Sequence, residues 1–177
     1  TYVKYDSHNR PCIVGTLATN SDRATLVPLV EASTGRFETR NTSSVGYTMN
    51  ASYPTTATES TVLSITYYDD YSFKSGSGFS TTYDFEGVAD YGMSTYWGAS
   101  AGQTLRGLAT GSKSRSQGEN LVWMYSVTYY DKYYQPVQTV SSHQQGGKMR
   151  SSSLYAFSGE VLKSRTRYDY TGPSNTT

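Results

Sequence analysis

The stretch VTYYDKYYQPVQTV (Val127–Val140) decides the fold class that we expect for this chain. Its first part continues the alternation begun by Trp123 and Tyr125, which puts every second side chain on one apolar face of a strand. Asp131 then favours a turn, and the apolar residue after Pro136 begins a returning strand. The stretch therefore predicts an antiparallel β-hairpin.

Parts of this pattern recur along the chain. The segment ITYYDDYSF (Ile65–Phe73) repeats the TYYD core, and the spacing from Tyr130 to Pro136 reappears between Tyr5 and Pro11. A variant of the pattern places a Gly four residues after a Tyr. The residues that carry the repeat are Tyr5, Asp6, Pro11, Tyr68, Asp69, Tyr83, Asp84, Gly87, Tyr130, Asp131, Pro136, Tyr155 and Gly159.

The repeat has a simple physical interpretation as a hairpin-building unit. An Asp where the turn begins accepts hydrogen bonds from backbone N–H groups about two residues further on. A Gly or Asn four residues after the Tyr takes a positive φ and closes the turn. One such hairpin is marginally stable alone, and several stacked hairpins bury a continuous face. The sequence therefore predicts a structural role for the repeat.

Composition agrees with a β-rich chain. The 177 residues include 18 Tyr, and only 36% are hydrophobic. Tyr together with Thr, Ser and Gly is typical of strands rather than helices. We expect a mainly β fold in which antiparallel hairpins form an open curved sheet, with long loops and at most one short helix.

We expect that short helix after Ser21 or Asp22, with Pro28 limiting its length. The first residue is not Met, and the chain has no signal-peptide pattern, which favours a single fragment of a longer repeat protein. The expected segments are a hairpin (1–17), an insertion with the short helix (18–60), a strand (61–73), a Gly/Ser-rich insertion (74–120), further hairpins (121–170) and a tail (171–177).

The repeats resemble the YD-repeat, or Rhs, family, which comprises long bacterial surface or secreted proteins and has the animal teneurins as relatives. The resemblance covers about the first 15 and roughly the last 60 residues. It implies hairpins wound as a strip into a shell that encloses a toxin or presents an adhesive surface. Tyr134, Gln135 and Ala156 depart from the family pattern, and long insertions interrupt it. We therefore expect an open sheet, placed outside the cell or on its surface.

Candidate catalytic and metal-binding residues are few. His8 and His143 lie in expected turns, and Cys12 begins an expected returning strand, where a small buried residue is favoured over a nucleophile. Asp69, Asp70, Asp84, Glu86 and Asp90 could bind calcium but lack EF-hand spacing, and adjacent Asp residues more often cap turns. A pair of carboxylates for glycoside hydrolysis stays open, because their separation is spatial. We expect no enzymatic activity, catalytic residue, metal or other cofactor.

Lys163, Arg165 and Arg167 alternate and therefore share one face of a strand. They form either a solvated face that blunts a sheet edge or a basic site for an anionic glycan. The formal net charge of +1 gives no general attraction to nucleic acid, and no apolar run is long enough to span a membrane.

The leading hypothesis is a non-enzymatic scaffold that pairs with neighbouring repeats of its parent protein, or edge to edge with another copy. The alternative is an extracellular binding module that recognises a glycan or a host protein through exposed Tyr side chains and the basic face.

Overall fold

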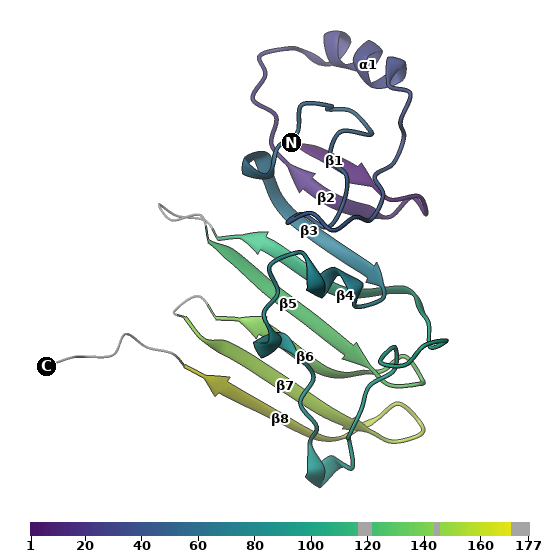
Figure 1. Ribbon diagram of the computed structural model, residues 1–177, viewed down its shortest axis with the longest axis vertical. Helices are drawn as coiled ribbons and strands as arrows, with labels where there is room; N and C mark the ends of the chain where they lie inside the picture. The colour runs from purple at the N-terminus through teal and green to yellow at the C-terminus, as the bar shows by residue number, and fades with distance from the viewer. Residues whose placement is uncertain (117–121, 144–145, 171–177) are drawn as a thin grey trace, which may run out of the picture. The chain divides into compact units, whose positions relative to one another are not determined.

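The computed structural model describes residues 1–116, 122–143 and 146–170. Within these ranges the chain is mainly β, and its strands are hydrogen-bonded to one another in sequence order in an open antiparallel sheet (Figure 1). This confirms the expected fold class. No helix in the described ranges is long and apolar enough to cross a bilayer. The strands are β1 (Tyr2–Tyr5), β2 (Pro11–Gly15), β3 (Val62–Asp69), β4 (Leu105–Arg115), β5 (Trp123–Tyr130), β6 (Pro136–Ser142), β7 (Lys148–Tyr155) and β8 (Val161–Asp169).

Contacts divide the chain into two compact units, each with its own core. The first unit contains Thr1–Thr66 and Phe73–Gly78, and the second contains Tyr67–Ser72 and Phe79–Thr177. The sequence did not predict this division. The helical elements are α1 (Arg23–Ala32) and the short 3-10 helices η1 (Glu59–Thr61), η2 (Ser72–Ser75), η3 (Thr81–Tyr83) and η4 (Ala89–Tyr91).

In the first unit, the β1–β2 hairpin extends through β2 to β3, where Ile13 lies opposite Ile65. Cys12, Ile13 and Ile65 are almost fully buried. Because neighbouring residues of β2 are both buried, this strand is covered on both of its faces. Leu63, which alternation places on the face of Ile65, is instead 41% exposed. The register shifts next to Val14, so Val62 takes the buried position.

Helix α1 begins where the sequence predicts. The Asp22 carboxylate accepts a hydrogen bond from the Thr25 backbone N–H at 2.9 Å, so Asp22 rather than Ser21 is the N-cap. That hydrogen bond lowers the pKa of Asp22. Pro28 lies inside the helix, which ends after ten residues.

A buried ion pair organises the loop that precedes β3. Lys4 Nζ lies 2.9 Å from Glu38 Oε1, and neither side chain is exposed to solvent. Lys4 also donates to the carbonyl oxygens of Ser52 and Pro54, while Glu38 accepts from the Thr48 hydroxyl and the Ser52 backbone N–H. These bonds replace the water that both charges lose on burial. The polar stretch 36–54 is thereby fixed against β1.

The second unit is built on the sheet of β4 to β8 (Figure 1). Away from the irregularities beside Tyr130 and Tyr155 the register is regular, and one row across β5 to β8 holds Tyr129, Gln138, Ser152 and Arg165. The neighbouring row on the opposite face holds Thr128, Thr139, Ser151 and Thr166. The two rows therefore differ: the first carries an aromatic ring and a charged residue, and the second carries only hydroxyl side chains.

The segment 79–97 supplies aromatic rings that contact the first of these faces. The Tyr129 ring centroid lies 4.6 Å from that of Tyr96, 5.6 Å from that of Phe85 and 5.0 Å from that of Tyr71. Tyr129 is fully buried, and its hydroxyl donates to the Tyr83 carbonyl oxygen at 2.7 Å. The range 74–120, expected to be a Gly/Ser-rich insertion, thus contributes both this aromatic cover and strand β4.

One expected turn is wrong. The sequence places a hairpin turn at Tyr83, Asp84 and Gly87, but Tyr83 ends the helix η3 and is buried. Its hydroxyl lies 2.6 Å from the Ser142 hydroxyl, and Gly87 does not take a positive φ. Long-range aromatic packing therefore overrides the local turn pattern at this copy.

We predict that acid weakens the first unit through Glu38. Burial alone raises the pKa of Glu38, but hydrogen bonds from Thr48, Ser52 and Lys4 outweigh it and lower the pKa to about 2. A carboxylate whose folded pKa lies below its unfolded value of about 4.3 contributes stability above that value and loses it as pH falls toward 2. Glu38→Gln should reduce the free energy of unfolding by about 3 kcal/mol at pH 7, and the difference should shrink between about pH 4.3 and 2.

Urea unfolding of the wild type and the Glu38→Gln variant over this pH range measures the effect. Glu31→Gln, at an exposed position of α1, is the matched control and should change little. A Glu38→Gln effect that stays constant down to pH 2 would contradict the assignment.

We also predict that the two adjacent tyrosines of the TYYD core differ in their contribution to stability. Tyr129→Ala should cost about 4 kcal/mol, because it removes a fully buried ring and its hydrogen bond. Tyr130→Ala should cost about 1 kcal/mol, because that side chain is only half-buried. Chemical unfolding monitored by tyrosine and tryptophan fluorescence compares the two variants, and equal losses would show that the assignment of faces is wrong.

Candidate functional site

The turns that follow β1 and β5 are built in the same way. Asp6 Oδ1 accepts from the backbone N–H groups two and four residues ahead, at 2.9 and 3.0 Å. Asp131 Oδ1 accepts from the equivalent groups at 2.8 and 2.9 Å. In both turns the residue three after the Asp donates its N–H to the Asp carbonyl oxygen. The carboxylate therefore fixes the whole loop and not only its first residue.

The turn between β7 and β8 has the same backbone without the carboxylate. Gly159 donates its N–H to the carbonyl oxygen of Ala156, as Tyr134 does to that of Asp131. The φ angles of Asn9, Tyr134 and Gly159 are +59°, +64° and +86°, all in the left-handed region. Tyr134 adopts this region although it is not Gly, which is an uncommon conformation for such a residue.

These turns set the same strand register in all three hairpins. Tyr5 pairs with Pro11, Tyr130 with Pro136, and Tyr155 with Val161. A register irregularity accompanies each of these pairs. A turn followed by a left-handed residue and a bulge is a common three-residue hairpin connection. The spacing of six residues from Tyr to its partner is therefore a geometric repeat.

The copy at Tyr68 and Asp69 does not form such a hairpin. Asp69 has a φ of +74°, and its Oδ1 accepts from the Gly107 backbone N–H at 2.7 Å. The next residue, Asp70, accepts from the Ser72 backbone N–H at 2.8 Å. The chain leaves β3 here and returns to a strand only at Leu105.

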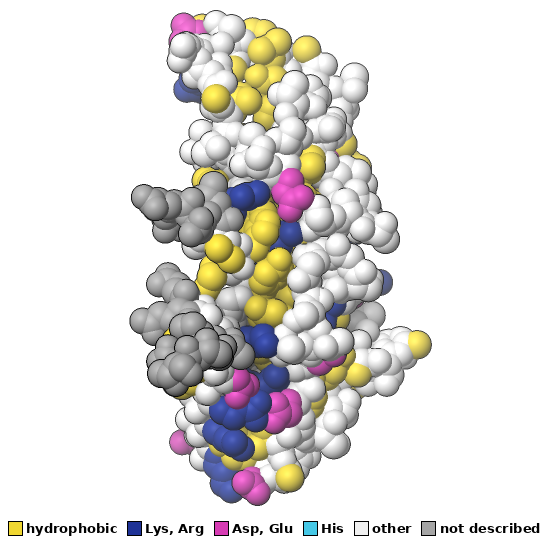
Figure 2. Space-filling model, turned by 60° about the vertical axis from the view of Figure 1, so that its left-hand side comes forward, with side chains coloured by type: hydrophobic (Ala, Val, Ile, Leu, Met, Phe, Trp, Pro, Cys, Tyr) yellow, Lys and Arg dark blue, Asp and Glu magenta, His cyan; other side chains and the backbone are white. Residues whose placement is uncertain are grey.

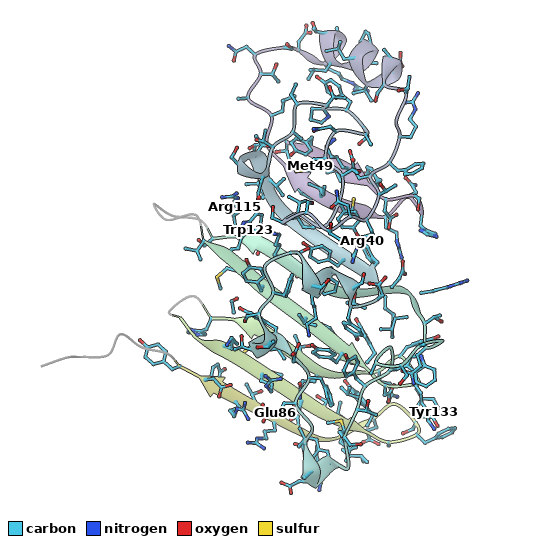
Figure 3. All side chains as sticks on the ribbon, viewed as in Figure 1. Arg40, Met49, Glu86, Arg115, Trp123 and Tyr133 are labelled. Carbon is cyan, nitrogen blue, oxygen red and sulfur yellow. The ribbon has the colours of Figure 1, made fainter. Side chains whose placement is uncertain are left out.

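The basic residues of β8 lie in a charged cluster with an acidic residue from the segment that contacts the sheet. Arg167 makes two hydrogen bonds to the Glu86 carboxylate, at 2.6 and 2.7 Å, and two to the Asp169 carboxylate, at 2.9 and 3.1 Å. Arg150 Nε on β7 lies 3.3 Å from the same Glu86 carboxylate. The hydrogen bonds from Arg167 lower the pKa of Glu86. Figure 3 shows Glu86 beside these last two strands.

Lys163 and Arg165 share this face but have no carboxylate partner among the described residues. Both side chains are exposed. Lys163 Nζ lies 6.0 Å from the centre of the Tyr91 ring, at the outer limit of a cation–π contact. At the lower end of Figure 2, where Figure 1 places β8, basic side chains gather next to acidic ones. The expected basic face thus contains one residue paired with carboxylates, Arg167, and two cations, Lys163 and Arg165, that have no such partner in the described part of the chain.

The tips of the β5–β6 and β7–β8 hairpins expose aromatic rings. Phe157 is 92% exposed, and Tyr133 and Tyr134 are 55% and 49% exposed. The rings of Tyr133 and Phe157 lie 6.1 Å apart in an edge-to-face arrangement, and Figure 3 labels Tyr133 at its hairpin tip. The sequence signals their exposure by position, because each lies one to three residues after Asp131 or Ala156, the residues that begin these turns.

A cavity of about 730 Å³ lies at the other end of the second unit. Its lining includes Arg115, Trp123 and His143. Lys113 Nζ and the Arg115 guanidinium each lie 4.6 Å from the centre of the Trp123 ring, and Figure 3 labels Arg115 and Trp123. The side chains of Lys113 and Arg115 therefore already occupy the space next to the Trp123 ring.

The candidate catalytic residues lie in separate places. His8 is exposed in the first turn, and the ring of His143 contacts that of Tyr168 at 6.2 Å. Burial and the charges of Asp6 and Glu38 raise the pKa of the Cys12 thiol to about 12. Cys12 therefore stays protonated at neutral pH and is a poor nucleophile. Within the described ranges, no three His, Cys, Asp or Glu side chains lie close enough to hold a metal ion.

Comparison of the chain with protein-family models, with curated proteins and with solved structures found no match. The turns, the charged cluster on β8 and the exposed aromatic tips are the features of the chain that bear on its function.

The turn carboxylate gives a prediction with a built-in control. Asp131→Ala removes an acceptor for two backbone N–H groups and should cost about 1 kcal/mol. Ala156→Asp introduces the missing carboxylate at the equivalent position and should stabilise the protein by about 0.5 kcal/mol. Thermal or urea unfolding of both variants measures these changes. If Ala156→Asp destabilises the protein as much as Asp131→Ala does, the two turns are not equivalent.

Proposed function

We propose that this chain is a non-enzymatic structural segment, a strip of antiparallel hairpins that pairs with neighbouring strips in a YD-repeat, or Rhs-like, surface or secreted protein. The observation that supports it is the common turn geometry at Asp6, Asp131 and Ala156. A turn that sets the same register each time allows a sheet to grow one hairpin at a time. In this proposal the protein acts outside the cell or on its surface.

The charged and aromatic residues of the second unit fit this role. Tyr129 and its ring neighbours hold the sheet against the segment 79–97, so they serve packing rather than recognition. Strand β8 is the last in the hydrogen-bonded order of the described strands, and its outer edge is available to a neighbouring strand. In the scaffold role, the outer edge of β8 therefore pairs with the strand that follows it.

A second candidate function has its own observation. Phe157, Tyr133 and Tyr134 expose aromatic rings at adjacent hairpin tips. Exposed rings of this kind stack on sugars or pack against a protein partner. In this alternative the chain is an extracellular binding module that recognises a glycan or a host protein through these exposed rings and the basic face of β8.

Hydrogen exchange separates the two functions. The scaffold proposal predicts that outward-facing β8 amides exchange rapidly in this chain alone and slowly in a longer protein carrying the sequence encoded on either side. Tyr-Asp turns with the six-residue Tyr-to-partner spacing should continue in that flanking sequence. Equal exchange of the β8 amides in both proteins would contradict the scaffold role.

Phe157→Ala is the companion variant for the alternative function. It should leave β8 exchange unchanged, because Phe157 lies in the turn and is almost fully exposed. If the chain is a binding module, a glycan found in a screened panel should raise the melting temperature of the wild type, and Phe157→Ala should abolish that shift.

A further inference from the structure

The outer edge of β8 is long and regular. The strand has nine residues without Pro, and its only register irregularity lies at its first pair, Tyr155 with Val161. Eight of the nine residues are exposed, and the remaining one, Arg167, is half-buried. Natural edge strands that avoid pairing are usually short, bulged or interrupted by Pro. Strand β8 is long, has no Pro and is irregular only at its first pair; of the features that blunt an edge it has only charged side chains. Its backbone can therefore accept a further strand whose charge suits those side chains.

The side chains along this edge differ between its two faces. Lys163, Arg165 and Arg167 share one face, and the other face carries Ser164 and Thr166. The cationic side chains lie opposite Leu154, Ser152 and Arg150 of β7. The neighbouring strand thus supplies no negative charge, and one of its residues adds another positive charge.

The chain neutralises only one end of this row. The Glu86 carboxylate lies within 2.7 Å of both terminal nitrogens of Arg167 and 3.3 Å from Arg150 Nε. It therefore bridges two like charges that lie directly opposite each other. Lys163 and Arg165, four and two residues before Arg167, have no equivalent carboxylate among the described residues. The local chemistry thus shows the type of group that this row binds.

We propose that the β8 edge accepts an antiparallel strand with acidic residues at alternate positions, placed to face Lys163 and Arg165. The inference rests on the proposed scaffold role, and it adds the chemistry of the neighbouring strand. Backbone hydrogen bonds provide the pairing, and the two carboxylates select the partner and its register. A neutral strand leaves both cations without a partner.

The same charges exclude a second copy of this chain as the partner in the register centred on Arg165. Antiparallel pairing of two β8 strands about Arg165 sets Arg165 against itself and Lys163 against Arg167. Like charges directly opposite each other destabilise a strand pair. The cations therefore oppose self-pairing in that register while leaving the edge open to an acidic strand.

Peptide binding to the intact chain tests the proposal. The probes are two nine-residue peptides that alternate Thr with Glu or Thr with Lys, and β8 amide shifts are followed by NMR. We expect the Glu peptide to bind at least ten-fold more tightly than the Lys peptide and to slow exchange of the outward-facing β8 amides. The preference should decrease as salt concentration rises.

Two variants with the same change in net charge separate local pairing from general attraction. Lys163→Gln with Arg165→Gln removes two positive charges from the proposed face, and Ser164→Glu with Thr166→Glu adds two negative charges to the other. The first should lose the ten-fold preference, and the second should retain it within about three-fold. Both sites are exposed, so the fold should persist, and circular dichroism checks this.

The outcomes also distinguish this inference from the scaffold role. Equal binding of both peptides, or equal loss in both variants, overturns the acidic selectivity while the edge still accepts a strand. No binding of either peptide overturns the inference but leaves the separate exchange test of the longer protein to decide the scaffold role. Self-association of the wild type through β8 overturns the exclusion of a second copy.

Discussion

Burial of the Tyr129 ring is the constraint on which the second unit depends. The ring is fully buried, and the Tyr83 carbonyl oxygen satisfies its hydroxyl. A buried phenol without that acceptor would lose its hydrogen bond to water without replacement. The segment 79–97 must therefore approach the sheet closely enough for both packing and hydrogen bonding. A Gly/Ser-rich composition does not prevent order when a few aromatic residues supply most of the buried area.

The hairpins could be predicted from sequence because their determinants are local. Asp131 and its two N–H donors lie within four residues, so local spacing indicates this turn, although the same pattern forms no such turn at Tyr83. The aromatic cover and β4 could not be predicted, because Tyr83 and Tyr129 are 46 residues apart. Strand β4 also lacks a plain apolar alternation, since its residues include Gly107 and Gly111. Its place in the sheet is set by its partners.

The charged sites show the same limit. Alternation correctly places Lys163, Arg165 and Arg167 on one face, and Asp169 is a local partner of Arg167, but nothing local shows that a distant carboxylate also pairs with Arg167. Its partner Glu86 is 81 residues away. The Lys4–Glu38 pair likewise joins residues 34 positions apart. A polar residue in an expected loop therefore gives little warning that it is the buried centre of a unit, because its burial depends on tertiary contacts.

A division of tasks between turns, faces and edge explains the unusual composition of the sheet. Local turns with a bulge already fix the register, so the row of hydroxyl side chains does not need apolar residues to fix it. The row of Thr128, Thr139, Ser151 and Thr166 can therefore be small and uncharged. An edge without such a turn has no internal control of its register. Side-chain charge is the remaining way to control which strand pairs there, and on β8 that charge is positive.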